Sequence, residues 1–327
     1  MNVSPGSCRD TVVLAAVEQA IDKLNKDRVE GYIFGLHRLR NVNQMEHGNV
    51  GMVFYLTMDV LETNCHVLSR KTTEACEIRS YADSPVYGQC KAVIYISPRP
   101  SVVHLYQYNC VVRPVSRQKV ASFCPDCPTY MSVDNDKIQK TAALSVEKFN
   151  SKRSQANHFA VLQVTLAQAS MAWGILYVVE FTIQETTCSS NTDSSTASLC
   201  RLMSCRLAHR GHCKGSFFKV RGSKETVNVN CEVFKRNPQV CSYRPLGTVT
   251  ILPALGLPMT TPSTTPYVSH QPVGVQGTVN PGVFGMSPPV IVPFPTTVSV
   301  QCPAEVQAED HFVRELFAED SLFKTAA

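Results

Sequence analysis

The clearest hydrophobic pattern follows Asp10, a residue type that often caps the N-terminus of a helix. Apolar side chains then recur at intervals of three and four residues, which places them on one face of a helix. The positions are Val13, Val17, Ala20, Ile21 and Leu24. We therefore predict an amphipathic helix whose apolar stripe packs on a core.

The segments after this helix have the composition of β-strands. Between Val53 and Val60, large apolar residues roughly alternate with small or polar ones, as in a half-buried antiparallel strand. The predicted strands are Tyr32 to Leu39, Gly51 to Glu62, Gln89 to Ile96 and Val102 to Val112. One helix followed by antiparallel strands predicts an α+β domain with the helix across one face of the sheet.

The whole pattern occurs twice. Counterparts of the five apolar helix positions lie 125 residues later, at Ile138, Ala142, Ser145, Val146 and Phe149. Phe159 to Leu166 and Gly174 to Glu185 match the first two strands. Four cysteines recur at offsets of 123, 124, 123 and 121 residues: Cys65, Cys76, Cys90 and Cys110 as Cys188, Cys200, Cys213 and Cys231. We predict two tandem copies of one α+β domain.

The composition changes after the second copy. From Pro245 to Pro303 the chain is rich in Pro, Thr, Ser, Val and Gly, which predicts an extended, disordered stalk. Beyond it, Val306, Val313, Leu316 and Phe317 predict a short amphipathic helix between Glu305 and Ala318. The expected divisions are domain 1 at 1–122, a linker at 123–130, domain 2 at 131–244, the Pro/Ser/Thr-rich segment at 245–303 and a tail at 304–327.

Fourteen cysteines at regular spacings indicate a disulfide framework, which requires an oxidising compartment. We expect the local pairs Cys65–Cys76, Cys90–Cys110, Cys188–Cys200 and Cys213–Cys231, each of which closes a loop between strands.

No apolar run is long enough for a membrane span. The first nine residues lack a signal-peptide core, so we expect a mature or recombinant start of a secreted protein. Asn2-Val3-Ser4 is a glycosylation sequon, with Asn2 as the acceptor.

The net charge of +5 comes from scattered Lys and Arg residues, so we expect neither nucleic-acid binding nor membrane insertion. The chain also lacks the residue patterns of an enzyme. Its nine histidines are dispersed, and no nucleophile–base pattern or His-Glu-x-x-His motif is present. We therefore expect a protein without catalytic activity and without a cofactor.

A short segment between the copies has no counterpart in either: Cys124-Pro125-Asp126-Cys127-Pro128. If the two cysteines are bridged, they close a tight ring, and the prolines stiffen it further because each fixes its own φ and restricts the preceding residue. The Asp126 carboxylate would project from this ring. A catalytic zinc with three protein ligands keeps one position open for water, and a carboxylate oxygen can take that position at about 2 Å.

Other interpretations of this segment stay open from its spacing alone. Cys-x-x-Cys is also typical of a redox pair, although that pair belongs at a helix start after a parallel strand. It can supply half of a zinc site, for which Cys205, His209, His212 and Cys213 are candidate partners. It can also be a stiff linker and nothing more.

The doubled cysteine frame, the helix-then-strands order, the Cys-Pro-Asp-Cys-Pro segment and the Pro/Thr-rich C-terminal region resemble the fetuin family of the cystatin superfamily. The resemblance is strongest to the fetuin-B branch, fish forms included. It implies tandem cystatin-like domains, each an antiparallel sheet wrapped on one helix. It also implies a bridge from the first cysteine to the last, Cys8–Cys302. Cys124–Cys127 is then the bridge within the linker, and the remaining cysteines, Cys205 and Cys241, are expected to pair.

The same resemblance implies a monomeric, secreted inhibitor of astacin-type zinc metalloproteases such as egg and hatching enzymes. Asp126 would point at the zinc of the protease, held by the cysteines and prolines around it, and the inhibitor would need no metal of its own. The first hairpin of the second domain would enter the cleft beside the linker, through Ser170, Met171, Ala172, Trp173 and Gly174.

Two other functions of this superfamily are less well supported by the residues. Inhibitors of papain-like proteases use Gln-x-Val-x-Gly, but here the segment from Gln44 to Gly48 has Glu46 in place of the valine, and a charge is costly to bury on docking. The mineral-binding branch uses acidic residues on the first domain's sheet, and the corresponding strand here, Gly51 to Glu62, has only Asp59 and Glu62. A plasma carrier or mineral-binding scaffold is thus the alternative function.

Overall fold

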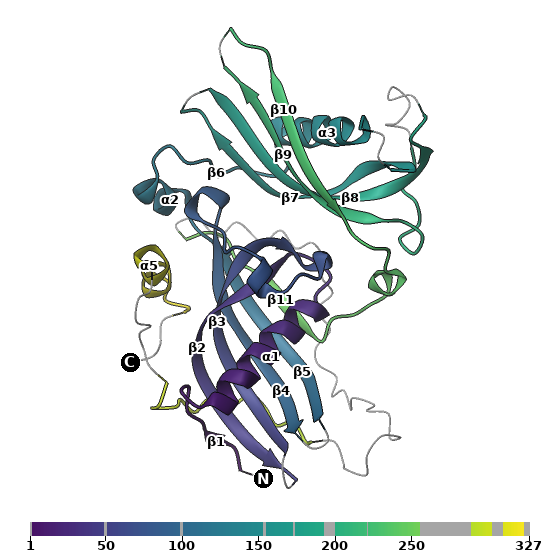
Figure 1. Cartoon of the computed structure of the whole chain (residues 1–327). Helices are drawn as coiled ribbons and strands as arrows, with labels where there is room; N and C mark the ends of the chain where they lie inside the picture. Colours follow the sequence, from purple (N-terminus) through teal and green to yellow (C-terminus); the bar gives the residue numbers. More distant parts are fainter. Residues whose placement is uncertain are drawn as a thin grey trace.

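The computed structural model describes residues 2–48, 51–98, 101–152, 155–172, 174–192, 200–220, 222–255, 289–302 and 310–323. Two sheets follow one another along the chain, and each carries one long helix (Figure 1). The strand order is β1-β2-β3-β4-β5-β11 in the first sheet and β10-β9-β8-β7-β6 in the second. The prediction of two tandem α+β domains is confirmed.

The first domain begins with β1 (Ser4–Pro5) and helix α1 (Thr11–Asp27). The Asp10 carboxylate accepts a hydrogen bond from the Val12 amide at 2.8 Å, so the predicted N-cap is confirmed. The long strands are β2 (Tyr32–His47), β3 (Gly51–His66), β4 (Val86–Pro98) and β5 (Ser101–Pro114), with short helical turns η1 (Val67–Ser69), η2 (Thr73–Ala75) and η3 (Tyr81–Asp83) between β3 and β4. All five predicted apolar positions of α1 are buried in the core of this domain.

Strand β2 continues eight residues beyond its predicted end at Leu39. Its pairing with β3 shifts register between Leu36 and Arg38 and again between Leu39 and Asn41. Each shift inserts an extra residue and reverses which side chains face the core. The alternation of apolar and polar residues therefore fades in the sequence although the strand goes on.

Helix α2 (Arg117–Phe123) connects the domains, and the second domain repeats the order of the first. Its elements are β6 (Thr129–Tyr130), α3 (Asp136–Asn150), β7 (Asn157–Ser170), β8 (Ile175–Ser189), β9 (Arg210–Lys219), β10 (Thr226–Val233) and the turn η4 (Pro238–Cys241). In both domains the helix packs on one face of the sheet, against alternate residues of the central strands.

An asparagine at the end of each long helix joins it to the first long strand. The Asn25 side chain donates to the Phe34 carbonyl at 2.8 Å and accepts from the Phe34 amide at 2.9 Å. Asn150 makes the same two bonds to Phe159, at 2.9 and 3.0 Å. The repeat therefore keeps a polar contact of the same geometry as well as its apolar pattern.

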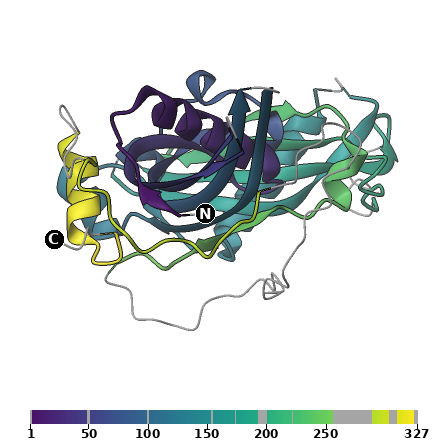
Figure 2. The same ribbon diagram turned by 90° about the horizontal axis from the view of Figure 1, so that it is seen from below.

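The C-terminal part of the chain returns to the first domain. β11 (Gly247–Ile251) pairs in parallel with β5, and Val249 packs against the core of this domain. Residues 289–302 lie along the face of the sheet opposite α1, where Phe294 contacts the Tyr55 ring and the Val292 amide donates to the Tyr55 hydroxyl at 3.1 Å. Figure 2 shows this segment running beside the sheet towards helix α5 (His311–Glu319).

The predicted stalk at 245–303 thus differs from expectation at both ends, which are held on the first domain. Thr248, Val249, Thr250 and Ile251 are β-branched, and this run is a strand signal that the surrounding prolines obscured. Residues 256–288 and Pro303 lie outside the described residues. The helix predicted between Glu305 and Ala318 is present as α5 from His311 to Glu319, and Val306 lies outside the described part.

Seven disulfides are present, and they are the seven expected pairs: Cys8–Cys302, Cys65–Cys76, Cys90–Cys110, Cys124–Cys127, Cys188–Cys200, Cys205–Cys241 and Cys213–Cys231. The Cys8–Cys302 bridge anchors the C-terminal segment beside the start of α1.

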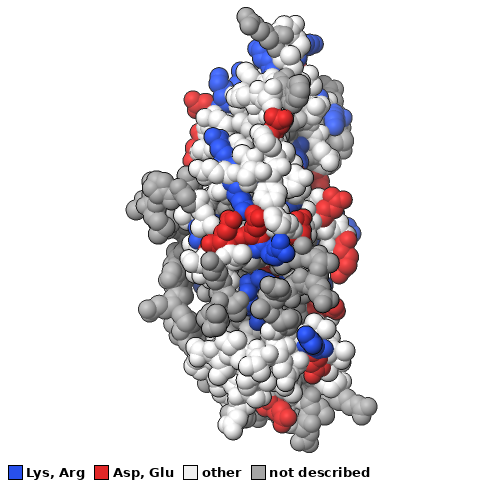
Figure 3. Space-filling model, turned by 90° about the vertical axis from the view of Figure 1, so that its left-hand side faces the viewer, with Lys and Arg blue, Asp and Glu red and all other residues white. Residues whose placement is uncertain are grey.

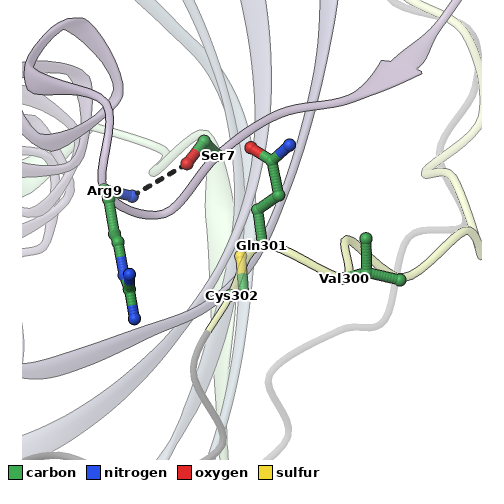
Figure 4. Close-up of a pocket in the computed structure, with 5 residues that line it drawn as sticks. All are labelled: Ser7, Arg9, Val300, Gln301 and Cys302. Atoms are coloured by element: carbon green, nitrogen blue, oxygen red, sulfur yellow. Dashed lines mark hydrogen bonds between the residues drawn. The ribbon is translucent and has the colours of Figure 1, made fainter.

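A shallow hollow next to the Cys8–Cys302 bridge is lined by Ser7, Arg9, Val300, Gln301 and Cys302 (Figure 4). Arg9 is the one charged residue of this lining, and we assign it no ligand.

The helix-to-strand contact predicts unequal effects in the two domains. Asn25 is only 6% exposed, so Asn25→Ala leaves a buried amide and a buried carbonyl without a partner. We expect a loss of about 3 kcal/mol in the free energy of unfolding, measured by urea titration. Asn150→Ala is the matched control and should cost less, because its half-buried site admits water. Equal losses in the two variants would contradict this account.

Candidate functional site

The segment Cys124–Pro128, called the linker turn below, directly follows α2. The Cys124 amide donates to the Val120 carbonyl at 2.9 Å, which extends the helical hydrogen bonding by one residue. The Cys127 amide then donates to the Cys124 carbonyl at 3.2 Å, and the disulfide closes the same turn. Pro125 and Asp126 lie at its exposed end. The turn therefore presents a carboxylate to solvent, and both a backbone hydrogen bond and a disulfide restrain its backbone.

A strand of two residues joins the linker turn to the second domain. Thr129 and Tyr130 form β6, which pairs with Ala169 and Gln168 of β7. Gln168 is 2% exposed, and its side-chain amide donates to the Ala82 carbonyl at 3.0 Å and to the Pro128 carbonyl at 3.5 Å. Gln168 therefore contacts the first domain, the linker and the second domain at once. Gln168 opens the second domain's counterpart of the Gln-x-Val-x-Gly hairpin, a segment two residues too long for that motif, and the sequence did not predict these contacts.

The hairpin between β7 and β8 places its tip, residues Ser170 to Gly174, beside the linker turn. The Ser170 hydroxyl donates to the Asp126 carbonyl at 3.4 Å, so two predicted site residues are in contact. Met171 is 61% exposed, and Ala172 is exposed as well. Trp173 lies outside the described residues.

Gly174 occupies a backbone conformation that favours glycine, with φ at +143°. A Cβ at this position would lie 2.8 Å from the Lys219 carbonyl oxygen at the end of β9. The absence of a side chain therefore lets the hairpin tip approach the next strand closely. The structure thus brings together Asp126, Ser170 and the exposed residues of the tip.

Helix α5 packs against α2, directly before the linker turn. The sequence predicted this helix but not its contact with α2. Phe123 packs edge-on against Phe312 with ring centroids 5.0 Å apart. Lys119 forms ion pairs with Glu315 and, at 2.7 Å, with Glu319. Figure 3 views this side of the molecule and shows acidic and basic side chains adjacent across its middle.

An apolar cluster beneath this surface combines residues from the first domain with α2 and the C-terminal part. It contains Leu61, Tyr87, Val115, Val120, Phe312, Leu316, Phe317 and Phe323, and Cys127 packs against it. One side of the linker turn therefore rests on the first domain and α5. The other side is paired with the second domain.

The redox and zinc interpretations of the linker turn do not fit this geometry. The turn follows a seven-residue helix between two domains, whereas a thioredoxin-like pair begins a helix after a parallel strand. Cys205 and Cys213 are bridged to Cys241 and Cys231 and so do not supply free thiolates. Within the described ranges, no cluster of three or more His, Cys, Asp or Glu side chains is arranged to hold a metal.

The acidic residues of β3 are poorly placed for mineral binding. Asp59 is 0% exposed and is paired with Arg38 and Arg40 at 2.7 Å each, and Glu62 is buried. Gln44 to Gly48 form the end of β2 and its turn, at the opposite end of the first domain from the linker (Figure 1). Glu46 is exposed there. Asn2 is also exposed, just before β1.

Comparison with known proteins gives a consistent set of relatives. A family model of the cystatin domain matches residues 3–99 and 127–222. Human fetuin-B is 38% identical over 230 residues, which are 70% of this chain and 58% of the human protein. Mouse fetuin-B is 37% identical over 241 residues, 71% of this chain and 60% of the mouse protein. The chain thus spans less than two thirds of the length of these curated relatives.

Solved structures resemble the chain over most of its length. The crystal structure of mouse fetuin-B has a TM-score of 0.71 and 33% identity, covering 95% of this chain and 98% of that one. Mouse fetuin-B in complex with crayfish astacin has a TM-score of 0.72 and 32% identity, covering 96% and 98%. The inhibitory complex of human meprin beta with mouse fetuin-B has a TM-score of 0.66 and 36% identity, covering 77% and 78%.

The geometry of the linker turn predicts a local role for its disulfide. In the chain-entropy model, Cys124→Ser/Cys127→Ser removes a very small ring and costs about 2 kcal/mol, whereas Cys205→Ser/Cys241→Ser opens a larger loop and costs about 4 kcal/mol. The first variant should remain folded by circular dichroism. Its amide at position 127 should exchange hydrogen faster than in the parent. Unchanged exchange would show that the turn is rigid without its bridge.

Proposed function

The chain belongs to the cystatin family, with two cystatin domains in the tandem arrangement of the fetuins, and we propose that it inhibits astacin-type zinc metalloproteases. The observation that carries this proposal is the exposed Asp126 on a disulfide-closed turn, with the hairpin tip of the second domain directly beside it. In this role the protein acts by binding an enzyme and performs no catalysis itself.

The similar structures support the proposal through their partners. Mouse fetuin-B forms one complex with crayfish astacin and an inhibitory complex with human meprin beta. This chain has the same fold and the Cys-Pro-Asp-Cys-Pro turn between its domains. We propose an astacin-type protease as the partner of the monomeric chain, and egg-envelope or hatching enzymes as the specific targets.

The proposed chemistry is displacement of water from the zinc of the protease. A catalytic zinc keeps one coordination position for water, and the Asp126 carboxylate would take that position. Zinc would then lack the nucleophile that hydrolysis needs. The inhibitor supplies the carboxylate and its support, and the metal belongs to the protease.

The support matters because ordering a flexible loop costs about 0.5–1.5 kcal/mol for each immobilised side chain. The disulfide, the pairing of β6 with β7 and the bond from Ser170 restrict the linker turn before any partner binds. The turn is also folded back by the bond from the Cys127 amide, so it does not lie extended as a protease substrate does. Both properties suit an inhibitor that is not cleaved.

The remaining features fit an extracellular inhibitor. Seven disulfides are typical of proteins that fold in an oxidising compartment. None of the helices in the described part is both long and apolar enough to cross a membrane. We propose secretion, with a glycan on the exposed Asn2.

The role of Asp126 can be tested by titrating crayfish astacin with the chain and its variants. Asp126→Ala should raise the inhibition constant about 100-fold or more, since loss of a charged ligand at a desolvated site costs about 3 kcal/mol. Asp134→Ala is the matched control, because Asp134 is an exposed carboxylate close in sequence, between β6 and α3. Its inhibition constant should equal that of the parent.

Two outcomes would contradict the proposal at different levels. Unchanged inhibition by Asp126→Ala would remove the carboxylate from the mechanism and leave inhibition standing. Failure of the parent chain to inhibit several astacin-type proteases would favour the plasma-carrier alternative.

The hairpin tip gives a second, independent test. Gly174→Ala introduces a Cβ against the Lys219 carbonyl and should move the tip, weakening inhibition of astacin about tenfold while the domain stays folded. Gly222→Ala is the control. Gly222 also has a positive φ, at +80°, but a Cβ there meets nothing within 4 Å. Equal inhibition by both variants would argue against a role for the tip.

A further inference from the structure

The two domains meet at a buried ion pair that the function described above does not use. The Arg79 guanidinium donates to both carboxylate oxygens of Glu180, at 3.0 and 2.7 Å. Their side chains are 1% and 4% exposed. Arg79 comes from the loop between η2 and η3 of the first domain, and Glu180 from β8 of the second. Because Val179 and Phe181 face α3, Glu180 lies on the opposite face of that sheet, towards the first domain.

Aromatic rings surround this ion pair. His66 stacks between His212 and Phe234, with centroids 5.5 and 5.7 Å away. The Tyr32 hydroxyl is 2.7 Å from the Thr165 hydroxyl and 3.2 Å from His212 Nε2, and Arg79 lies 4.1 Å above the Tyr32 ring. We call these residues the interdomain joint: Tyr32, His66 and Arg79 of the first domain, with Thr165, Glu180, His212 and Phe234 of the second.

Exposed ion pairs border the joint. Lys214 contacts Asp83 at 2.8 Å, and Lys71 contacts Glu232 at 2.9 Å. Such exposed pairs contribute little to stability, because water and salt screen them. The buried pair is different, since removing one partner leaves the other charge desolvated and uncompensated. The angle between the domains therefore depends mainly on the joint.

The joint and the linker turn are connected through strand β7. Thr165 and Gln168 are on β7, which carries the hairpin tip, and Gln168 also contacts Ala82 of the first domain. The linker turn itself is held from both sides, by β6 on the second domain and by the apolar cluster on the first. A change in the angle between the domains would therefore separate the two sets of contacts that position Asp126.

We propose that the interdomain joint locks the linker turn and the hairpin tip into one arrangement at neutral pH and opens in acid, when its two histidines take up protons. Arg79 and Glu180 are then positioning residues, which act on Asp126 through the angle between the domains. The opening of the joint stands independently of the proposed function. Its effect on inhibition rests on that function.

The surroundings of the histidines disfavour their protonated forms. Burial, with the nearby His212 and Arg28, lowers the pKa of His66 to about 3. Burial lowers the pKa of His212 to about 4, despite the attraction of Glu180. The other charged groups that face the two histidines are Arg70 and Arg79 from the first domain and Lys214 and Glu232 from the second, and Glu62 faces Arg79. A proton on either ring would enter a site that already contains several cations.

The direction of the pH effect follows from these pKa values. In the open state the exposed histidines titrate near pH 6.5, so below that pH the open state binds protons that the closed state excludes. Each pH unit below 6.5 favours opening about tenfold for each histidine until its closed-state pKa is reached, or about 10⁴-fold in total at pH 4.5. The closed arrangement is thus most stable above pH 6.5 and is lost as the pH falls.

The two buried carboxyl groups act in opposite directions. Burial alone would raise the pKa of Glu180, but the hydrogen bonds and charge of Arg79 outweigh it and lower this pKa to about 2. Protonation of Glu180 in the open state therefore adds to opening below about pH 4.5. Burial raises the pKa of Glu62 in spite of Arg79 and Arg28, so Glu62 offsets part of the effect. As the pH falls, both histidines and Glu180 favour the open state, whereas Glu62 favours the closed state.

Small-angle X-ray scattering of the full chain at pH 7.5 and pH 4.5 tests the opening directly. We expect a larger radius of gyration at pH 4.5 with unchanged far-UV circular dichroism, because the domains separate while each stays folded. An identical radius at both pH values would overturn the proposal. This measurement uses the unaltered protein and does not depend on any variant.

Variants test whether the histidines are responsible. His66→Phe keeps a stacking ring and His212→Gln keeps a polar partner for Tyr32, and neither titrates, so the double variant should stay compact at pH 4.5. Lys71→Gln is the control on the exposed border and should open as the parent does. Opening of the double variant at the same pH as the parent would overturn the role of the histidines. If the double variant does not fold, His66→Phe alone should open at a lower pH than the parent, and an unchanged opening pH would count against the proposal.

The effect of the joint on inhibition is tested by measuring the inhibition constant for crayfish astacin between pH 7.5 and pH 5.5. Glu180→Gln removes the charge partner of Arg79, so the joint of this variant should open at a higher pH than in the parent. Its inhibition constant should rise at least tenfold between pH 7.5 and pH 5.5. The inhibition constant of Lys71→Gln should follow that of the parent. An identical pH profile for Glu180→Gln and the parent would overturn the positioning role. If the parent does not inhibit at pH 7.5, the proposed function fails, whereas the scattering result still decides whether the joint opens.

Discussion

The arrangement of the site depends on one constraint, which is that the linker turn is attached to both domains at once. The pairing of β6 with β7 sets its register on the second domain, and Cys127 packs on the apolar cluster of the first. A segment held on one side alone would follow that domain and present Asp126 in many directions. Attachment on both sides gives this short connection one defined shape. The conformational entropy of the linker turn is lost when the protein folds, so binding a partner does not require that loss again.

The elements that local patterns determine could be predicted from the sequence. The apolar stripe of α1, the cap at Asp10, the repeat and its cysteine frame all depend on residues close to one another in the chain. Strand ends were predicted less well, because the register shifts of β2 break the alternation on which the prediction depends. The return of β11 to the first sheet has no local cause, since it needs a partner, β5, that lies far away in the sequence.

The same distinction applies to the site. Asp126 and its neighbours were proposed from the Cys-Pro-Asp-Cys-Pro segment together with the resemblance to the fetuins, and Ser170 from that resemblance. The contacts of Gln168 and the ion pair between Arg79 and Glu180 were not predicted, since they join residues about 40 to 100 positions apart in the sequence. Such groups become visible only when the packing of the two domains is known.

The duplicated frame explains why only the first copy contributes a buried arginine to the joint. Arg79 and Met203 are equivalent positions, because each donates its amide to the carbonyl of an equivalent glutamate, Glu62 or Glu185, at 3.0 and 2.9 Å. Each also follows an isolated bridge of the same type, Thr63 to Ile78 or Thr186 to Leu202. In the first copy this loop abuts the second domain, and a buried cation there has Glu180 as its partner. In the second copy the loop ends half-exposed, where the uncharged Met203 needs no partner. The repeat thus supplies the same backbone twice, and the neighbour of each copy decides which side chain that backbone can carry.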